Sequence, residues 1–242
     1  MHQRYALGRN LTSEATDALT DLLRGYVARP VNLIVDLGSG TGRFTAALAE
    51  AFAAQVLGVE PAANMRLTAK SKSHPATIRF VQGQAESIPL DDSVVDLVFM
   101  SQVLHHLADG PKALREIGRV LKSNGSLCIR QTTRENLDSY FYQRFFPAAR
   151  AVDERRLPSR KELGGAARAC GFRAVAIETL SHQIAASAAE YVDKIALRTY
   201  SDLECIDDAA FHEGLDSLRE HSSAQPGFPK HAENDVFIFE KI

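Results

Sequence analysis

The sequence predicts an α/β fold with a doubly wound, mostly parallel sheet of about seven strands, and three observations lead to it. Short apolar runs alternate with segments of helical periodicity from residue 12 to residue 130. The run over residues 94–100 is almost continuously apolar, which is typical of a strand buried on both faces of a parallel sheet. The run over residues 235–240 alternates with a period of two, so we expect an antiparallel last strand.

The elements of the first half follow one another in regular order. Apolar positions at helical spacing predict a helix over residues 12–28, and Pro61 opens another helix at a favoured first position. A helix over residues 111–123 should end at Asn124-Gly125. The other predicted elements of this half are a helix over 41–53 and strands over 31–37, 55–60, 77–82, 94–100 and 126–130.

The second half is less regular. Helices are predicted over the aromatic-rich residues 134–150 and over residues 159–170, and a strand over residues 172–180. Residues 187–221 are helical in pattern and rich in charge, so we expect a helical insertion before the last strand. The expected organisation is one domain over residues 1–242, with residues 187–221 as a lid.

Charge and composition narrow the possible functions. Lys and Arg total 28 and Asp and Glu total 30, so the formal net charge is −2, whereas nucleic-acid binders usually carry a strong basic excess. A basic cluster is interpreted as a solvated loop; it comprises Arg155, Arg156, Arg160 and Lys161. No apolar run suits a transmembrane helix or a secretory signal, and no cysteine spacing suits a metal, so we expect a cytoplasmic protein without a metal site.

The strongest motif is the glycine-rich loop Asp36-Leu-Gly38-Ser39-Gly40-Thr-Gly42, which ends the first strand. Ligands of open α/β sheets bind at the carboxyl ends of strands, and glycines let the backbone approach them closely. A tight turn without a ligand is the alternative. A dinucleotide-binding motif has its third glycine three residues after the second, where this chain has Arg43. The loop therefore suggests a ligand without a pyrophosphate.

Polar residues follow the next three strands as well. Glu60 ends the second strand, where a carboxylate can accept hydrogen bonds from both hydroxyls of a ribose; the alternative is a charge favourable to the helix that follows. Gln84 and Ala85 lie in a loop after the third strand. The fourth strand ends in the segment Ser101-Gln-Val-Leu-His-His106.

Taken together, these motifs resemble the class I S-adenosylmethionine-dependent methyltransferases, specifically their small-molecule and ubiquinone-biosynthesis-like group. The resemblance is close from Tyr5 to about Gly125 and much weaker beyond residue 130. It implies a Rossmann-like fold and S-adenosylmethionine as cofactor, with S-adenosylhomocysteine as product.

The resemblance also implies a set of cofactor-binding residues: Tyr5, Arg9, Asp36, Gly38, Ser39, Gly40, Gly42, Glu60, Met65, Gln84, Ala85, Ser101 and Gln102. In the family, residues at the glycine loop hold the methionine part, and the carboxylate at Glu60 holds the ribose. Met65 and the backbone N–H of Ala85 are expected at the adenine. Gln84 departs from the usual aspartate, but its side-chain oxygen can also accept a hydrogen bond.

The further roles implied by the resemblance lie around the reacting end of the cofactor. Ser101 and Gln102 are expected to contact its amino-acid portion, and Tyr5 and Arg9 to close over it. Independently of the resemblance, His105 and His106 are the candidate general bases, because they follow the strand whose end is expected to face the cofactor. In the family such a pair usually hydrogen-bonds within the strand-to-helix turn, which is the alternative. Methyl transfer depends chiefly on alignment, so it needs a base only when the nucleophile carries a proton to lose.

Two segments of the second half are candidates for contact with a substrate. The aromatic run is expected either to line a pocket or to pack in the core; it comprises Tyr140, Phe141, Tyr142, Phe145 and Phe146. The segment Arg198-Thr-Tyr-Ser201 is interpreted as a solvated helix face, with binding of an anionic group as the alternative.

The predicted function is transfer of a methyl group to a small-molecule substrate. One alternative is a module that binds an adenosyl ligand without turnover, and another is a methyltransferase acting on RNA or protein. Nucleic-acid amine methyltransferases often carry Asn/Asp-Pro-Pro-Tyr/Phe after the fourth strand, where this chain has Ser101-Gln-Val-Leu. A nucleic-acid partner is therefore not expected.

Overall fold

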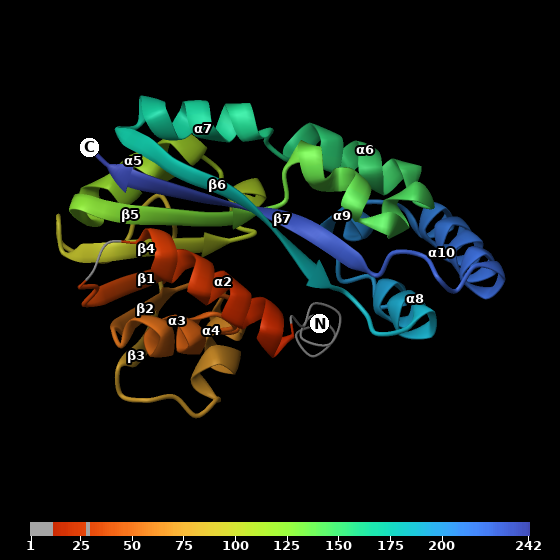
Figure 1. The fold of residues 1–242 in the computed structure, drawn as a ribbon, viewed down its shortest axis with the longest axis horizontal. Coiled ribbons are helices and arrows are strands. Elements are labelled where there is room, and N and C mark those ends of the chain that lie inside the picture. The colour runs from red at the N-terminus through yellow and green to blue at the C-terminus, as the bar shows by residue number, and fades with distance from the viewer. Residues whose placement is uncertain (1–11, 28–29) are drawn as a thin grey trace. The chain divides into compact units, whose positions relative to one another are not determined.

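The structure is a computed structural model that describes residues 12–27 and 30–242 (Figure 1). Its sheet has seven strands in the order β3-β2-β1-β4-β5-β7-β6. Neighbouring strands among β1–β5 are parallel, and β7 is antiparallel to β5, so the predicted doubly wound sheet with an antiparallel last strand is confirmed. The strands are β1 (Leu33–Leu37), β2 (Gln55–Val59), β3 (Ile78–Val81), β4 (Val95–Ser101), β5 (Leu121–Gln131), β6 (Phe172–Gln183) and β7 (His231–Lys241).

Helices follow most of the strands along the chain. Among the described residues, the α-helices are α2 (Ser13–Tyr26), α3 (Thr45–Phe52), α4 (Ala63–Lys70), α5 (Gly110–Val120), α6 (Pro147–Arg156), α7 (Arg160–Ala169), α8 (Ala188–Ala196), α9 (Ser201–Glu204) and α10 (Asp208–Ala224). Three short 3₁₀ helices are η1 (Leu104–His106), η2 (Arg134–Ser139) and η3 (Phe141–Arg144). Within the described ranges, no helix is both long and apolar enough to cross a membrane.

The chain divides into two compact units, each made of several segments. The sheet unit comprises residues 16–131, 160–179 and 235–242. The helical unit comprises residues 132–159 and 180–234, together with residues 12–15 of the described chain. That residues 1–242 act as one domain, with residues 187–221 as its lid, stays a prediction.

The core of the sheet unit explains the apolar strands. One face of the sheet, which includes Val35 and Val98, packs in one buried cluster with Ile117 of α5 and Ala167 of α7. The opposite face buries Phe99, whose ring meets that of Phe44 edge-on at 5.3 Å. Because β1 and β4 are covered on both faces, their sequences are apolar at nearly every position. Figure 1 shows α7 and α2 on different sides of the sheet.

The helical unit has a core of its own, and most of the aromatic run belongs to it. Tyr140, Phe141, Tyr142 and Phe146 are buried in one apolar cluster. The hydroxyl of Tyr142 donates a hydrogen bond to Asp202 at 2.9 Å, so its polar end is satisfied inside this core. Core packing is therefore confirmed for these four side chains.

Several predicted helices end elsewhere than expected. The helix predicted over residues 134–150 is wrong: η2, η3 and α6 replace it, because Tyr140 is non-helical (φ −84°, ψ 83°) and Pro147 starts a new helix. The helix predicted to reach residue 123 ends at Val120, and Leu121 pairs with Val95 as the first residue of β5. Sheet pairing there overrides the apolar helical pattern.

The charged segments of the second half also differ from expectation. The basic cluster is not a loop, because Arg155 and Arg156 lie in α6 and Arg160 and Lys161 lie in α7. Arg156 pairs with Asp153 of its own helix at 2.7 Å. Ion pairing within folded elements, rather than solvation of a loop, accounts for this part of the cluster.

The segment at Arg198 is not a solvated helix face. Arg198 has a φ of +52° and lies between α8 and α9, so the pattern over residues 187–221 is broken into three helices. Its guanidinium donates hydrogen bonds to the carbonyl of Leu203 at 2.9 Å and to Asp208 at 2.5 Å. Through these bonds the Arg198 side chain connects the end of α8 to α9 and α10.

Candidate functional site

Strand register in the sheet unit brings the predicted site residues to one edge. Leu37 of β1 pairs with Val59 of β2 on one side and with Met100 of β4 on the other. The strands are parallel, so the residues that follow them, including Gly38 and Glu60, leave the sheet at the same carboxyl edge. The glycine loop, the Glu60 carboxylate and the end of β4 are therefore neighbours.

The glycine loop adopts a conformation that suits glycine. Gly38, Gly40 and Gly42 have φ values of +73°, +55° and +74°, in the left-handed region. A Cβ on Gly38 would lie 2.5 Å from a methyl of Val103, and one on Gly42 would lie 2.8 Å from the ring of Phe80. A Cβ on Gly40 would meet no atom of the described residues within 4 Å. Packing thus requires two of the glycines, whereas Gly40 faces open space.

Ser39, between the first two glycines, has a polar group that the protein does not satisfy. The residue is only 7% exposed, and its Oγ has no hydrogen-bond partner among residues 12–27 and 30–242. Buried polar atoms in folded proteins are nearly always hydrogen-bonded, so an exception needs an explanation. A polar ligand held against the loop would supply the missing partner. The site therefore fits a small polar group at this point.

Glu60 connects the glycine loop to the start of α4. Its carboxylate accepts one hydrogen bond from the backbone N–H of Gly40 and another from that of Ala62, both at 2.9 Å. Ala62 directly precedes α4, so the predicted interaction with the helix N-terminus is present. A carboxylate has about four acceptor positions, so two remain for the hydroxyls of a ribose. Binding of a ribose by Glu60 stays a prediction.

Asp36 lies beneath the loop and is 2% exposed. It accepts a hydrogen bond from the hydroxyl of Thr45 at 2.6 Å. Burial raises the pKa of Asp36 to about 7, the Thr45 hydrogen bond opposes this shift, and the charge of Glu60 adds to it. A cation bound at the loop would favour the ionised form of Asp36 and lower its pKa.

The turn after β3 carries the residues expected at the adenine. Gln84 and Ser87 form an isolated antiparallel bridge, and Ala85 between them is 4% exposed. Glu86 accepts hydrogen bonds from the backbone N–H groups of Ala108 at 3.1 Å and Asp109 at 3.3 Å, which join this turn to the segment after η1. Met65, in the first turn of α4, is half-buried. Contact of these residues with adenine stays a prediction.

The end of β4 is held by the end of β5. Gln102 has a φ of +58°, which is unusual for a residue other than glycine. Its N–H donates to the carbonyl of Arg130 at 2.9 Å, and its side-chain oxygen accepts from the amide of Gln131 at 3.1 Å. The Arg130 guanidinium reaches the hydroxyl of Ser101 at 3.3 Å. Two residues of β5 thus position the two predicted cofactor contacts that follow β4.

The two candidate bases lie in η1, beside this network. The amide of Gln131 reaches Nδ1 of His105 at 3.4 Å, and because an amide nitrogen can only donate, Nδ1 is the acceptor. The proton of the neutral imidazole is then on Nε2. The ring of His106 is exposed, and its centroid lies 4.0 Å from that of His105. Base catalysis by either histidine stays a prediction.

Three residues of this site were missed by the sequence interpretation: Thr45, Arg130 and Gln131. Arg130 is 6% exposed and Gln131 is fully buried, so neither is a solvated surface residue. The position of Arg130 and Gln131 directly after the apolar residues of the fifth strand was a usable signal, because the ends of the first four strands carry or precede predicted site residues. Tyr5 and Arg9 lie outside the described residues.

Part of the sheet unit matches a known protein family. Residues 35–129 match the family described as a methyltransferase domain. An uncharacterized methyltransferase-like protein of Schizosaccharomyces pombe is 34% identical over 121 residues. That match covers 50% of this chain and 45% of the relative, so it spans about half of either protein.

Solved structures share the fold over nearly the whole chain. A putative methyltransferase from an antibiotic biosynthesis pathway of Anabaena variabilis superposes with a TM-score of 0.74 and 20% identity, covering 93% of this chain and 97% of that one. The cyclase SpnF superposes with a TM-score of 0.66 and 20% identity, covering 97% of this chain and 83% of that one. At such identities the likeness concerns the fold alone, and proteins with different activities share it.

Proposed function

Because residues 35–129 belong to the class I S-adenosylmethionine-dependent methyltransferases, we propose that this chain transfers a methyl group from S-adenosylmethionine to a small-molecule acceptor. The observation that carries the proposal is the hydrogen bond between Glu60 and the Gly40 amide, beside the unsatisfied hydroxyl of Ser39. Both groups belong to residues at the carboxyl edge of the sheet, and the Ser39 hydroxyl is buried there. A ribose and an amino-acid group match their donors and acceptors.

The residues present fit the proposed cofactor. The Glu60 carboxylate has acceptor positions for the ribose hydroxyls, and Ser39 Oγ offers a hydrogen bond that the protein leaves unused. Asp36 offers a negative charge to a cationic group at the loop once it is ionised. The bound cofactor would supply an electrophilic methyl group on a sulfonium sulfur.

The chain's own contribution to the reaction is positional. Glu60 fixes the glycine loop, while Arg130 and Gln131 fix Ser101 and Gln102 at the end of β4. Rigid placement of this kind lowers the barrier by removing translational and rotational freedom, by up to about 7–11 kcal/mol in favourable cases. In the neutral form of His105, Nδ1 already accepts from Gln131 and Nε2 carries the proton, so alignment is the larger expected effect.

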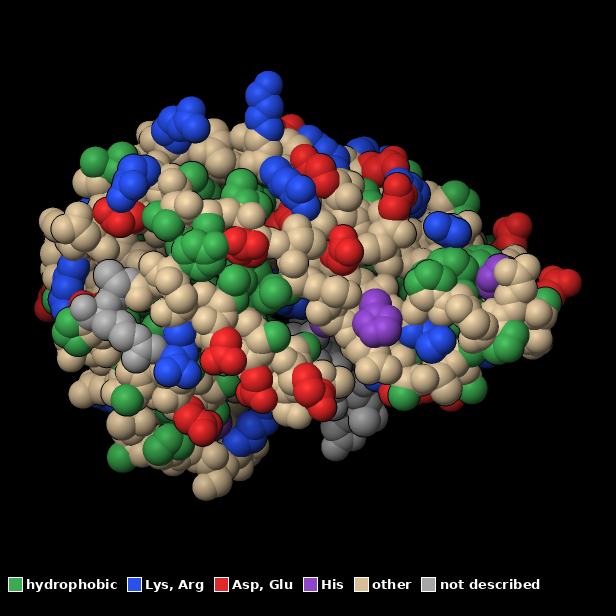
Figure 2. Space-filling view, viewed as in Figure 1, with side chains coloured by type: hydrophobic (Ala, Val, Ile, Leu, Met, Phe, Trp, Pro, Cys, Tyr) green, Lys and Arg blue, Asp and Glu red, His purple; other side chains and the backbone are tan. Residues whose placement is uncertain are grey.

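A small-molecule acceptor is supported by the charge of the chain. The formal net charge of −2 offers no general attraction for a polyanion. Figure 2 shows Lys and Arg side chains interspersed with Asp and Glu over the face in view, rather than gathered into one basic surface. The segment Ser101-Gln-Val-Leu lacks the motif common in methyltransferases that act on nucleic-acid amines. A small-molecule acceptor is therefore proposed over a nucleic acid.

A binding module without turnover is the second candidate function. The cyclase SpnF shares this fold, so the fold by itself does not specify methyl transfer. This likeness is the reason to retain the binding module as a candidate. Both candidates predict that S-adenosylmethionine binds. They differ in whether S-adenosylhomocysteine is produced.

The experiment that tests the proposal measures product formation. The protein is incubated with S-adenosylmethionine and pools of small metabolites, and S-adenosylhomocysteine is quantified by mass spectrometry. We expect formation that depends on both an acceptor pool and the protein, and its loss in Glu60→Ala. Tight cofactor binding with no acceptor-dependent product would favour the binding module instead.

A further inference from the structure

The helical unit contains a cavity that the proposed function does not use. Its volume is about 540 Å³, within the range of about 300–1,000 Å³ that is typical of small-molecule sites. It lies between η3, the end of α10 and the loop before β7. Every residue that lines it belongs to the helical unit, whereas the described cofactor candidates belong to the sheet unit.

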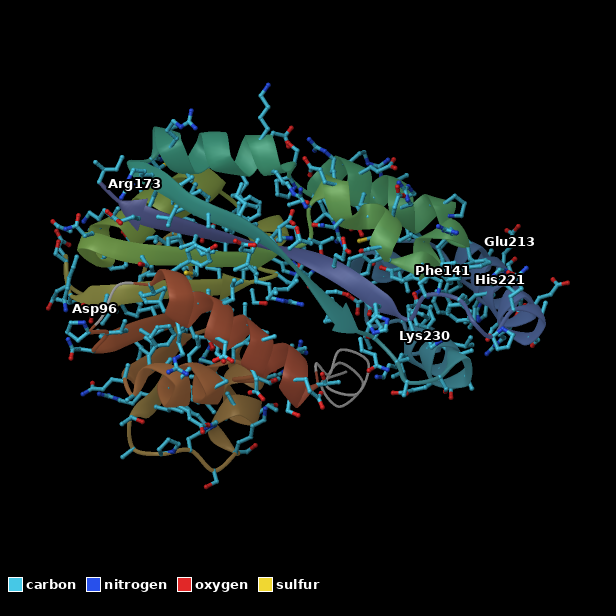
Figure 3. The ribbon with its side chains drawn as sticks, viewed as in Figure 1. Asp96, Phe141, Arg173, Glu213, His221 and Lys230 are labelled. Carbon is cyan, nitrogen blue, oxygen red and sulfur yellow. The ribbon has the colours of Figure 1, made fainter. Side chains whose placement is uncertain are left out.

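The walls of the cavity are aromatic and already ordered. Phe141 and Phe228 are 5% and 6% exposed, and their rings stack with centroids 4.8 Å apart and planes 10° apart. The ring of His221 lies 5.4 Å from that of Phe141 and 5.2 Å from that of Phe145. Figure 3 shows Phe141 and His221 side by side. A planar apolar ligand would therefore meet rings that are held by the core of the unit.

Arg144 adds a positive charge to these walls. Its guanidinium lies 5.0 Å from the centroid of the Phe141 ring, and the contact orients its planar group. It has no ion-pair partner among the described residues, in contrast to Arg150 and Arg156 of the same unit. No carboxylate is among the residues that line the cavity. The cavity therefore offers an unpaired guanidinium, which suits a carboxylate.

A second cation, Lys230, contacts a residue that lines the cavity but does not line it itself. Its ammonium group donates a hydrogen bond to the carbonyl of Phe228 at 3.2 Å and lies 5.6 Å from the Phe228 ring. Both cations are thus placed against the stacked pair of phenylalanines. Of the two, only Arg144 lines the cavity, so the aromatic walls select a planar body and Arg144 selects an anionic substituent.

We propose that this cavity is a binding site for a small aromatic carboxylate. The ring of the ligand packs against Phe145 and His221, and its carboxylate pairs with Arg144. The inference does not depend on methyl transfer, because it uses none of the residues of the candidate cofactor site. It can fail while the proposed function holds, and the reverse is also true.

The test uses 1-naphthoate as the probe. The chain has no tryptophan, so naphthalene emission can be followed without interference from indole. The fluorescence anisotropy of 1-naphthoate is titrated with the 242-residue chain, and the measurement is repeated with 1-naphthalenemethanol and 1-naphthylmethylammonium. For a ligand of this size we expect a dissociation constant of about 1 mM or lower for the carboxylate. The alcohol should bind more weakly, and the amine most weakly.

Two variants locate the site. Arg144→Met should weaken 1-naphthoate binding by about three- to tenfold, since Arg144 is partly solvated, and should leave the alcohol nearly unchanged. Arg155→Met is the matched control, because Arg155 is also an exposed arginine of this unit but does not line the cavity. Phe145→Leu should weaken both ligands. Absence of binding, tighter binding of the amine, or equal effects of Arg144→Met and Arg155→Met would overturn the proposal.

Discussion

The carboxylate of Glu60 accepts a hydrogen bond from the backbone N–H of Gly40 at 2.9 Å. This bond joins the end of β2 to the loop after β1, and the second carboxylate oxygen joins the same side chain to the start of α4. Glu60 therefore has a structural role in addition to the ribose binding that we predict for it. The predictions below separate these two roles.

Substitution of Gly38 should chiefly lower stability, whereas substitution of Gly40 should chiefly lower ligand affinity. Gly38→Ala places a methyl 2.5 Å from Val103, so we expect a clear loss of thermal stability. The added methyl of Gly40→Ala meets no atom within 4 Å in the part of the chain that the structure describes, so it should cost only about 1–2 kcal/mol for its left-handed backbone. Its methyl enters the proposed cofactor space, so S-adenosylhomocysteine affinity should fall by at least tenfold. Thermal melts and calorimetric titration measure the two effects; normal affinity in Gly40→Ala would place the ligand elsewhere.

Glu60→Gln should lose ligand affinity while keeping much of the loop structure. A glutamine oxygen can accept one of the two backbone hydrogen bonds, but it cannot serve both backbone donors and both hydroxyls of a ribose. Hydrogen bonds to charged groups contribute about 1.5–3 kcal/mol each, so the dissociation constant for S-adenosylhomocysteine should rise at least tenfold. Glu50→Gln, at an exposed position of α3, is the matched control. An unchanged dissociation constant in Glu60→Gln would limit Glu60 to its structural role.

The raised pKa of Asp36 predicts a pH dependence of stability. Burial raises this pKa from 3.8 to about 7, so between about pH 4 and pH 7 the folded state retains a proton that the unfolded state has lost. The contribution of Asp36 to the free energy of unfolding therefore decreases as the pH rises through this window, by at most about 1.4 kcal/mol per pH unit. Asp36→Asn removes this contribution and keeps an acceptor for Thr45.

Urea unfolding at several pH values measures the effect. The stability of Asp36→Asn relative to the unsubstituted protein should increase from pH 4 to pH 7. Asp91→Asn makes the same chemical change at an exposed position. If both substitutions had the same pH dependence, burial of Asp36 would not be the cause.

The ion pair between Arg160 and Asp235 should contribute more to the free energy of unfolding than an exposed ion pair in the same unit. Asp235 is fully buried and receives hydrogen bonds from two guanidinium nitrogens of Arg160, at 2.7 and 2.8 Å. Because Arg160 itself is partly exposed, we expect Arg160→Met to lower the free energy of unfolding by about 2–4 kcal/mol. Arg173→Met, which removes an exposed pair with Glu240, should cost less than about 1 kcal/mol. Denaturant titration compares them, and equal costs would contradict the prediction.

Much of the fold could be predicted because its strands are simple in pattern. The strands around Val35 and Val98 are apolar at nearly every position, since helices cover both faces, and this pattern is visible in the sequence alone. The start of β5 could not be predicted, because Leu121 suits a helix equally well and only its pairing with Val95 decides. The break at Arg198 depends on hydrogen bonds to residues up to ten positions later.

Some residues of the candidate site could likewise be predicted from the sequence, and others could not. The glycine loop and Glu60 are local motifs at strand ends, so spacing identifies them, and the match over residues 35–129 confirms the methyltransferase resemblance. The narrower grouping with ubiquinone biosynthesis stays a prediction. Gln131 was missed because its partners Gln102 and His105 are brought to it only by the pairing of β4 with β5.

The central claim is that the carboxyl edge of this sheet binds S-adenosylmethionine through Glu60 and the glycine loop. Calorimetric titration with S-adenosylhomocysteine tests it most directly, with NAD as the competing ligand. We predict one site per chain for S-adenosylhomocysteine, a dissociation constant at least tenfold higher in Glu60→Gln, and no binding of NAD. Binding of NAD without binding of S-adenosylhomocysteine would contradict the account.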